Sequence, residues 1–369
     1  MKIGRIVSEK RKERGMTQQE LADFIGVSKA SVSKWENDLT YPDITLLPLL
    51  AAFFDITLDQ LLDYHSQLTA DEIKRIYQLL QNNLVNKSGE EVLHELRRFV
   101  RRYYSCYPFI LQMGLFILNH YDYFPSVSDQ EKADVYIDEA RHLFLHVKKN
   151  TKDAYLINQA TNYEAYTLLA LKRPDEVLTL LGQHVPAYFP TESLIASAFQ
   201  QKGELDRGVA TLQSAIAQYL YVMMSGFTNY LQLLLNDFEK FKTTYHRGKV
   251  VADTFDLSHL HPIIWVNFQL SAAVGFAQFE QRDKVEEILT DFSHVVAKLS
   301  LPVELHGDAY FDQIESWLAQ LELGQQLPRK SENLQEELFA IVLEHPVFIP
   351  YHNEPFYKKI ETLKEHLNE

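Results

Sequence analysis

Apolar positions recur three or four residues apart along most of the chain, which is the spacing of one face of an α-helix. In the first 64 residues this pattern predicts five short helices, which begin near Ile3, Thr17, Ser28, Tyr41 and Thr57. Beyond residue 64 it predicts consecutive helices of about 12–20 residues with short breaks, and the alternation of strands and helices typical of a nucleotide-binding sheet is missing. The sequence therefore predicts an all-α protein.

Capping residues predict where the N-terminal helices begin and end. Thr17 with Glu20 forms a capping box at the start of the second helix, and Gly26 ends that helix. Ser28 caps the third helix, which ends at Asn37. Pro48 falls inside the fourth helix, where its missing N–H predicts a kink.

A helix, a tight turn and a second helix form the unit that places a recognition helix in the major groove of DNA. The residues that carry this unit are Thr17-Gln18-Gln19-Glu20-Leu21-Ala22, Gly26-Val27-Ser28, Ser31-Val32-Ser33-Lys34-Trp35-Glu36-Asn37 and Pro42-Asp43. Together they resemble the phage-repressor-type helix-turn-helix, over residues 1–64. The resemblance implies DNA binding, an Arg11–Glu36 ion pair and a phosphate contact from Asn37.

The side chains of the third helix suit DNA. Lysine reaches guanine O6 and N7, an alanine methyl can touch thymine, and helix N-termini favour phosphate. The predicted DNA-binding residues are Gln18, Ser28, Lys29, Ala30, Ser31, Ser33, Lys34 and Asn37. Ser31 or Ser33 could instead be merely solvated, and Trp35 is expected in the core rather than on a base.

Four later segments share one pattern, in which an apolar helix end and a basic residue precede a helix that resumes with valine or leucine. They are Leu171–Val177, Gln201–Leu205, Tyr245–Val250 and Glu280–Val285. Aligned at Val177, Val209, Val250 and Val285, the segments lie about 32, 41 and 35 residues apart, near the ~34-residue period of helical repeats. They resemble degenerate tetratricopeptide units, which implies a right-handed solenoid of helix pairs; an irregular helical bundle is the alternative.

Such a solenoid has a concave face that binds peptides or proteins. Asparagine can both donate to and accept from a peptide backbone, and neighbouring tyrosines could form pockets. The predicted peptide-binding residues are Asn158, Asn162, Tyr166, Asn229, Tyr230 and Asn267. The aromatic residues could equally belong to the core of the repeats.

In combination, the two halves resemble the Gram-positive peptide-pheromone regulators, the Rap–Rgg–PlcR–PrgX group. The predicted domains are a DNA-binding domain over 1–64, a linker helix region over 65–86 and a repeat domain over 87–369, with capping helices from about 331. The resemblance implies a homodimer on a palindromic operator, controlled in quorum sensing by a short peptide pheromone. The alternative is a regulator whose repeats bind a protein partner instead of a peptide.

Charge and composition exclude several classes of function. The chain carries a net charge of −14, whereas its first 40 residues carry eight basic and six acidic side chains, so only a local basic surface is possible. With one cysteine, neither a disulfide nor a zinc cluster of thiolates can form within the chain. We expect a cytoplasmic protein without membrane contact, cofactor or metal, and no enzyme, because no nucleophile–base pair, paired carboxylates or phosphate loop can be recognised.

Three weaker signals favour structural roles. His142 and His146 are four residues apart, one turn beyond Asp138, but a solvated helix face explains them better than a metal. Cys106 is expected to be a small buried hydrophobic residue. The basic run Arg97–Arg102 could contact phosphate, bind an acidic partner subunit or face solvent.

Overall fold

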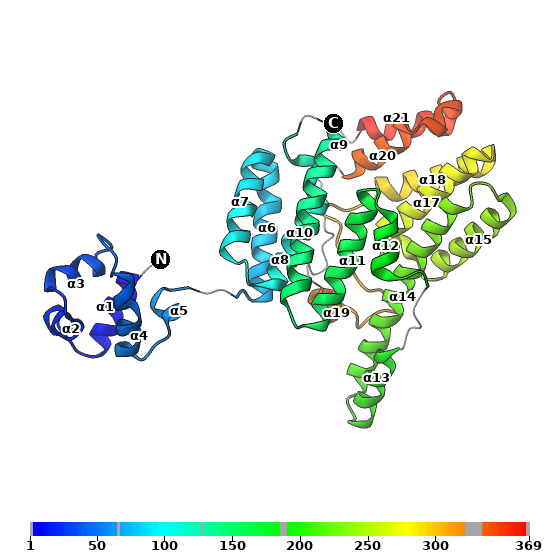
Figure 1. Ribbon diagram of the computed structural model, residues 1–369. Coiled ribbons are helices and arrows are strands. Elements are labelled where there is room, and N and C mark those ends of the chain that lie inside the picture. Colours follow the sequence, from blue (N-terminus) through cyan, green and yellow to red (C-terminus); the bar gives the residue numbers. More distant parts are fainter. Residues whose placement is uncertain (1–2, 65–66, 127, 185–189, 322–333, 367–369) are drawn as a thin grey trace. The chain divides into compact units, whose positions relative to one another are not determined.

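The computed structural model describes residues 3–64, 67–126, 128–184, 190–321 and 334–366 (Figure 1). These ranges contain many helices and no β-strand, which confirms the predicted all-α class. They form two compact units, residues 1–182 and residues 183–369, which are described separately. Residues 331–333 and 367–369, at the two ends of the predicted capping region, lie outside the described residues.

The first five α-helices have a hydrophobic core of their own, with buried side chains from Ile3 to Leu61. These elements are α1 (Ile3–Glu13), α2 (Gln18–Ile25), α3 (Lys29–Glu36), the 3-10 turn η1 (Ile44–Leu46), α4 (Leu47–Phe54) and α5 (Leu58–Leu61). The kink expected at Pro48 was wrong. Because α4 begins at Leu47, Pro48 lies in its first turn, where its missing N–H would have no partner within the helix.

The rest of the first unit is made of antiparallel helix pairs. Its elements are α6 (Ala70–Asn86), α7 (Gly89–Arg102), α8 (Tyr107–His120), η2 (Tyr121–Tyr123), α9 (Asp129–Lys132), the π-helical η3 (Ala133–Ile137), α10 (Asp138–Asn150), α11 (Ala154–Ala170) and α12 (Pro174–Leu181). α6 lies in the region predicted as a linker and packs against α7 and α8. The domain borders themselves stay predictions.

α6 and α8 run in the same direction, with α7 between them in sequence. Just before the two helices, the Leu68 N–H donates to Cys106 Sγ at 3.4 Å. Further along, the rings of Tyr77 and Phe116 meet edge to face with centroids 5.1 Å apart. At both points the two residues in contact are about 38 positions apart in the sequence. A helix hairpin that repeats along the chain produces this constant separation.

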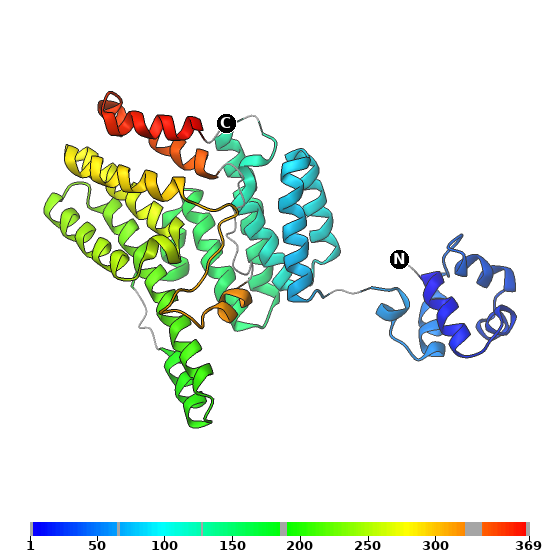
Figure 2. The ribbon, with the colours of Figure 1, turned by 180° about the vertical axis from the view of Figure 1, so that it is seen from behind.

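The second unit has the same helix-pair organisation. Its elements are α13 (Thr191–Gln201), α14 (Leu205–Leu233), α15 (Phe238–Thr254), α16 (Leu257–Leu260), α17 (Pro262–Gln278), α18 (Arg282–Ala297), α19 (Glu315–Gln320), α20 (Leu334–Glu344), η4 (Pro346–Tyr351) and α21 (Pro355–His366). α20 and α21 pack against α18, as Figure 2 shows.

α14 is 29 residues long and takes part in two successive hairpins. Its first turn packs on α13, where the Arg207 guanidinium lies 4.1 Å from the centre of the Phe199 ring. Its later turns run parallel to α17, because Tyr221 meets His261 and, 11 positions on, Gln232 donates to Ser271. One helix therefore serves both as the second member of one pair and as the first member of the next.

The helix break predicted at Arg247–Lys249 was wrong, because α15 runs without interruption through Gly248. A Cβ on Gly248 would lie 2.5 Å from the Phe268 ring, and one on Gly275 would lie 2.2 Å from the Phe241 ring. The two glycines thus let α15 and α17 approach each other closely at two points of an antiparallel pair. The other three predicted breaks, near residues 172, 203 and 281, do separate helices.

Candidate functional site

The turn between α2 and α3 has the geometry of a helix-turn-helix. The Thr17 hydroxyl accepts from the Glu20 N–H at 3.2 Å while the Glu20 carboxylate accepts from the Thr17 N–H at 2.7 Å, so the predicted capping box is confirmed. Gly26 ends α2 at φ 80°, a left-handed conformation that favours glycine. Ser28 then caps α3 by accepting from the Ser31 N–H.

One face of α3 is anchored in the core and the opposite face is open. Val32 and Trp35 are buried, which confirms Trp35 as a core residue. Ala30, Lys34 and Asn37 are exposed, Ser33 is half-buried, and the four follow one another at helical spacing. Of the other predicted DNA-binding residues, Ser28 and Lys29 are exposed, whereas Gln18 and Ser31 are half-buried.

Several of these polar groups already have partners within the chain. The Ser28 and Ser31 hydroxyls are 2.9 Å apart, and the Asn37 amide donates to the Ser33 carbonyl at 2.7 Å. Because an asparagine amide has two N–H bonds, one of them is still available to a phosphate. The structure thus brings the predicted residues of α3 to one surface, and their contacts with DNA stay predictions.

A buried ion pair holds α1 against α3. Arg11 and Glu36 form a bidentate pair at 2.6 and 2.8 Å, with side chains only 10% and 6% exposed, as the resemblance implied. Glu36 also accepts from Gln18 at 3.0 Å and from Ser8 at 3.2 Å. Burial alone would raise the pKa of Glu36, but these hydrogen bonds outweigh it and hold the pKa below its usual value.

The predicted peptide-binding residues of the first unit lie on α11. Asn158, Asn162 and Tyr166 follow each other at four-residue intervals and are all exposed. The Asn162 amide donates to the Asn158 side chain at 3.1 Å, so the two asparagines form one polar pair on the helix surface.

Those of the second unit lie on α14 and α17. Asn229, Tyr230 and Asn267 are exposed, and they occupy the stretch in which the two helices run in parallel. The Gln232–Ser271 hydrogen bond joins α14 and α17 one turn beyond the asparagines. None of the six predicted residues lines any of the three cavities described in this structure.

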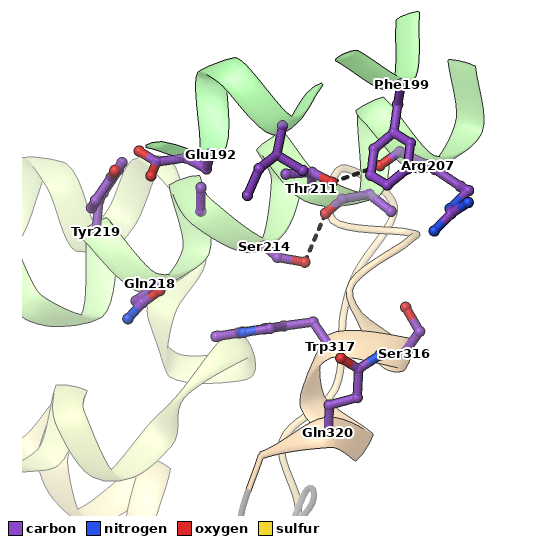
Figure 3. Close-up of a pocket in the computed structure, with 13 residues that line it drawn as sticks. Glu192, Phe199, Arg207, Thr211, Ser214, Gln218, Tyr219, Ser316, Trp317 and Gln320 are labelled. Carbon is purple, nitrogen blue, oxygen red and sulfur yellow. Dashed lines mark hydrogen bonds between the residues drawn. The ribbon is translucent and has the colours of Figure 1, made fainter. Parts of the chain in front are cut away.

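One of these cavities, which is open to solvent, lies between α13, α14 and α19 and has a volume of about 500 Å³ (Figure 3). Phe199 on α13 and Thr211 and Ser214 on α14 form one side of it, and Trp317 on α19 faces them across the gap. This cavity could not be predicted from the sequence, because α19 is only six residues long and follows a segment without regular structure. The available signal was a tryptophan beside such a segment, and in the structure Trp317 is half-buried.

The remaining sequence signals have structural explanations. The His146 ring stacks on Tyr104 and donates its Nε2–H to the Tyr104 carbonyl, and the His142 ring contacts the Asp138 carbonyl. Cys106 is buried, as expected. Among the described helices, none combines the length and the apolar character needed to cross a membrane.

The arginine side chains of the basic run Arg97–Arg102 differ in their surroundings. Arg97 forms a bidentate pair with Glu139 at 2.8 and 2.6 Å, which joins α7 to α10. Arg98 is 70% exposed and lies 3.8 Å from Glu95. At least one arginine of the run is therefore committed to an intrachain contact.

Comparisons with known proteins agree with the geometry of α2 and α3. A helix-turn-helix family matches residues 7–61. The transcriptional activator BcrR of Enterococcus faecalis is 31% identical over 83 residues, which is 21% of this chain and 41% of BcrR, so the match spans less than half of that relative. The transcriptional regulator SinR of Bacillus subtilis is 32% identical over 98 residues, which is 25% of this chain and 88% of SinR.

A solved structure, the apo form of the competence regulator ComR from Streptococcus vestibularis, aligns with 86% of this chain and 97% of its own length. The two are 14% identical and the TM-score is 0.22, which is too low to be evidence for a shared fold. The helix-turn-helix match and the coverage of SinR therefore identify the protein: the chain belongs to the helix-turn-helix family of DNA-binding transcriptional regulators.

Proposed function

We propose that this transcriptional regulator binds a palindromic operator as a homodimer and that a short peptide bound to its helix pairs controls it. The exposed face of α3 carries the first half of the proposal, because Lys34 and its neighbours stand away from the core on a capped helix. One recognition helix covers only a few base pairs, and symmetric pairs of them bind half-sites about one helical turn apart.

The asparagines of α14 and α17 support the second half. An extended peptide has main-chain N–H and C=O groups that must find partners when it is bound. Asn229 and Asn267 are exposed on two neighbouring parallel helices, and the side chain of Tyr230, beside Asn229, is 42% exposed. Such a surface offers donors, acceptors and an aromatic contact to one extended chain.

Operator binding by wild-type protein and by Lys34→Ala tests the DNA interface. If Lys34 reads a base, the loss is about 1–3 kcal/mol and specificity relaxes at one position of the operator. If it contacts phosphate, the loss is even across sequences and the salt dependence becomes shallower. Lys152→Ala, which removes an exposed lysine beyond the helix-turn-helix, is the control. Binding equal to wild type would remove Lys34 from the interface.

Calorimetry with short candidate peptides tests the ligand. Asn229→Ala should weaken binding about tenfold, because a peptide group left unpaired costs about 1–3 kcal/mol and 1.4 kcal/mol is tenfold. Asn236→Ala, which removes an exposed asparagine just beyond α14, should bind normally. Linkage requires that a bound peptide change operator affinity and that operator DNA change peptide affinity equally.

Two outcomes would contradict the proposal. A monomeric mass by light scattering, with and without operator DNA, would rule out the homodimer. Failure of every peptide to bind, together with specific binding of an identified protein partner, would favour the regulator whose repeats bind a protein.

A further inference from the structure

The cavity between α13, α14 and α19 is separate from the surface that carries Asn229 and Asn267. We propose that it is a specificity pocket for one uncharged aromatic side chain of the peptide ligand. This inference rests on the proposed peptide control and adds the chemical class of residue that the peptide presents. The cavity lies wholly within the second unit.

The size and the apolar surface of the cavity suit a large side chain. Its volume of about 500 Å³ falls within the 300–1,000 Å³ typical of small-ligand pockets. Phe199 of α13 lies across the cavity from Trp317 of α19, and Ile195, which also lines the cavity, is 48% exposed. An aromatic ring in the cavity would cover this apolar surface and gain edge or stacking contacts with the aromatic side chains that line it.

The polar groups of the lining match the amides that flank a peptide side chain. Gln218 and Gln320 present primary amides to the cavity from opposite walls. The Ser214 hydroxyl donates to the Ala210 carbonyl at 2.7 Å, so its lone pairs are left to accept from an N–H. The Thr211 hydroxyl likewise donates to the Arg207 carbonyl, at 2.8 Å, and its lone pairs are also left to accept. The cavity can therefore bind both the N–H and the C=O groups of a peptide.

Charge in the cavity argues against an ionic ligand. Among the 13 lining residues, Glu192 and Arg207 are the two that are charged at neutral pH, and their charges are opposite. Arg207 is also paired with Glu204 and stacked over Phe199. A free carboxylate or an ammonium group would find no net complementary charge here, whereas a neutral ring would not need one.

Contacts along the preceding segment hold the Trp317 wall in place. Gln213 of α14 donates to the Tyr310 carbonyl at 2.9 Å and to the Asp312 carboxylate at 2.8 Å. Its side-chain oxygen accepts from the Gln313 N–H at 2.8 Å. One glutamine thus fixes the chain four residues before Trp317, so the cavity is formed without a ligand.

Ligand-observed fluorine NMR with N-acetyl-4-fluorophenylalanine amide tests the pocket in the full chain. This probe carries one aromatic side chain between two amide groups. We expect saturable binding to wild type, a loss of about tenfold in Trp317→Ala and a smaller loss in Gln218→Ala. Ile349→Ala is the control, because it removes an equally apolar side chain, 62% exposed, outside the cavity. N-acetylalanine amide should compete poorly, and so should N-acetylaspartate amide.

Failure of the pocket and failure of peptide control give different results. The pocket is overturned if the fluorinated probe does not bind wild type, or if Trp317→Ala and Gln218→Ala bind it as wild type does. Because Gln218 is exposed, its variant stays informative if Trp317→Ala does not fold. If probe binding depends on Trp317 but no peptide binds or alters operator affinity, the pocket stands and peptide control fails. If peptides bind with dependence on Asn229 and not on Trp317, peptide control stands and the pocket assignment is wrong.

Discussion

Replacement of Glu36 by alanine should destabilise the helix-turn-helix core more than any loss of a surface charge. Glu36 accepts from Arg11 twice, from Gln18 and from Ser8, and its side chain is 6% exposed. In Glu36→Ala, Arg11 keeps its bond to the Met16 carbonyl but loses its counter-ion in a site where water cannot replace it. The guanidinium would then be a buried charge without compensation.

The expected cost is about 3–5 kcal/mol, which is the usual effect of removing one partner of a buried ion pair. A small domain has a free energy of unfolding of only about 5–15 kcal/mol, so the change removes a large share of it. The double variant Arg11→Met, Glu36→Leu should be much less destabilised than either single change predicts, because no lone charge is left. Glu13→Ala is the matched control, because the Glu13 side chain is 61% exposed and its pair with Lys10 should contribute only about 0–1 kcal/mol.

Urea unfolding followed by the fluorescence of Trp35 measures these costs. Trp35 is buried in the same core, and Trp265→Phe with Trp317→Phe in the background would leave it as the reporter. The folded-state pKa of Glu36 is lowered, so the pair contributes stability above the usual glutamate value of 4.5 and loses it as the pH falls through the folded-state pKa. A cost in Glu36→Ala no larger than in Glu13→Ala would refute the reasoning.

Three further predictions follow from single contacts. Burial lowers the pKa of His261 to about 4 in the folded state, whereas an unfolded histidine titrates near about 6.5. The unfolded chain therefore takes up the proton first as the pH falls. Urea unfolding should show that wild type loses about 2 kcal/mol of stability between about pH 7 and pH 5. His261→Asn, which can still cap α17, should lose less; an equal loss would contradict the assignment. Gly275→Ala should cost about 1–3 kcal/mol by forcing a methyl group against Phe241, whereas Gly226→Ala, with open space around it, should be neutral or stabilising; equal thermal shifts would argue against the close approach. Ser28→Ala should cost about 1 kcal/mol through loss of the cap on α3, measured by urea unfolding against the exposed Ser197→Ala, and an unchanged midpoint would show that the cap is unimportant.

The helix-turn-helix could be predicted from sequence because its signals are short-range. Thr17 and Glu20 are three residues apart, and Gly26 and Ser28 end one helix and begin the next within a single turn. Pro48 was misinterpreted because the exact start of α4 decides whether a proline interrupts the helix or lies in its first turn. Helix boundaries depend on packing that such local patterns do not contain.

Long-range packing explains what the sequence did not reveal. A helix break was predicted at Arg247–Lys249, but Phe268 packs against Gly248 and the helix continues. The Trp317 cavity depends on Gln213, which binds a segment about 100 residues further along the chain. Neither of these contacts leaves a periodic pattern in the sequence. The period of the helix pairs, in contrast, was enough to predict that Asn229 and Asn267 lie on neighbouring helices, and their role in binding a peptide stays a prediction.

The continuity of α14 affects how the second unit unfolds. In arrays of separate hairpins, each repeat can open alone, because only its interfaces with neighbours hold it closed. Here one helix of 29 residues belongs to two hairpins, so no flexible joint lies between the α13 hairpin and the α15–α17 pair. When either hairpin opens, the other loses packing contacts with α14. We therefore expect the amides of this stretch to exchange as a single cooperative unit in native-state hydrogen exchange.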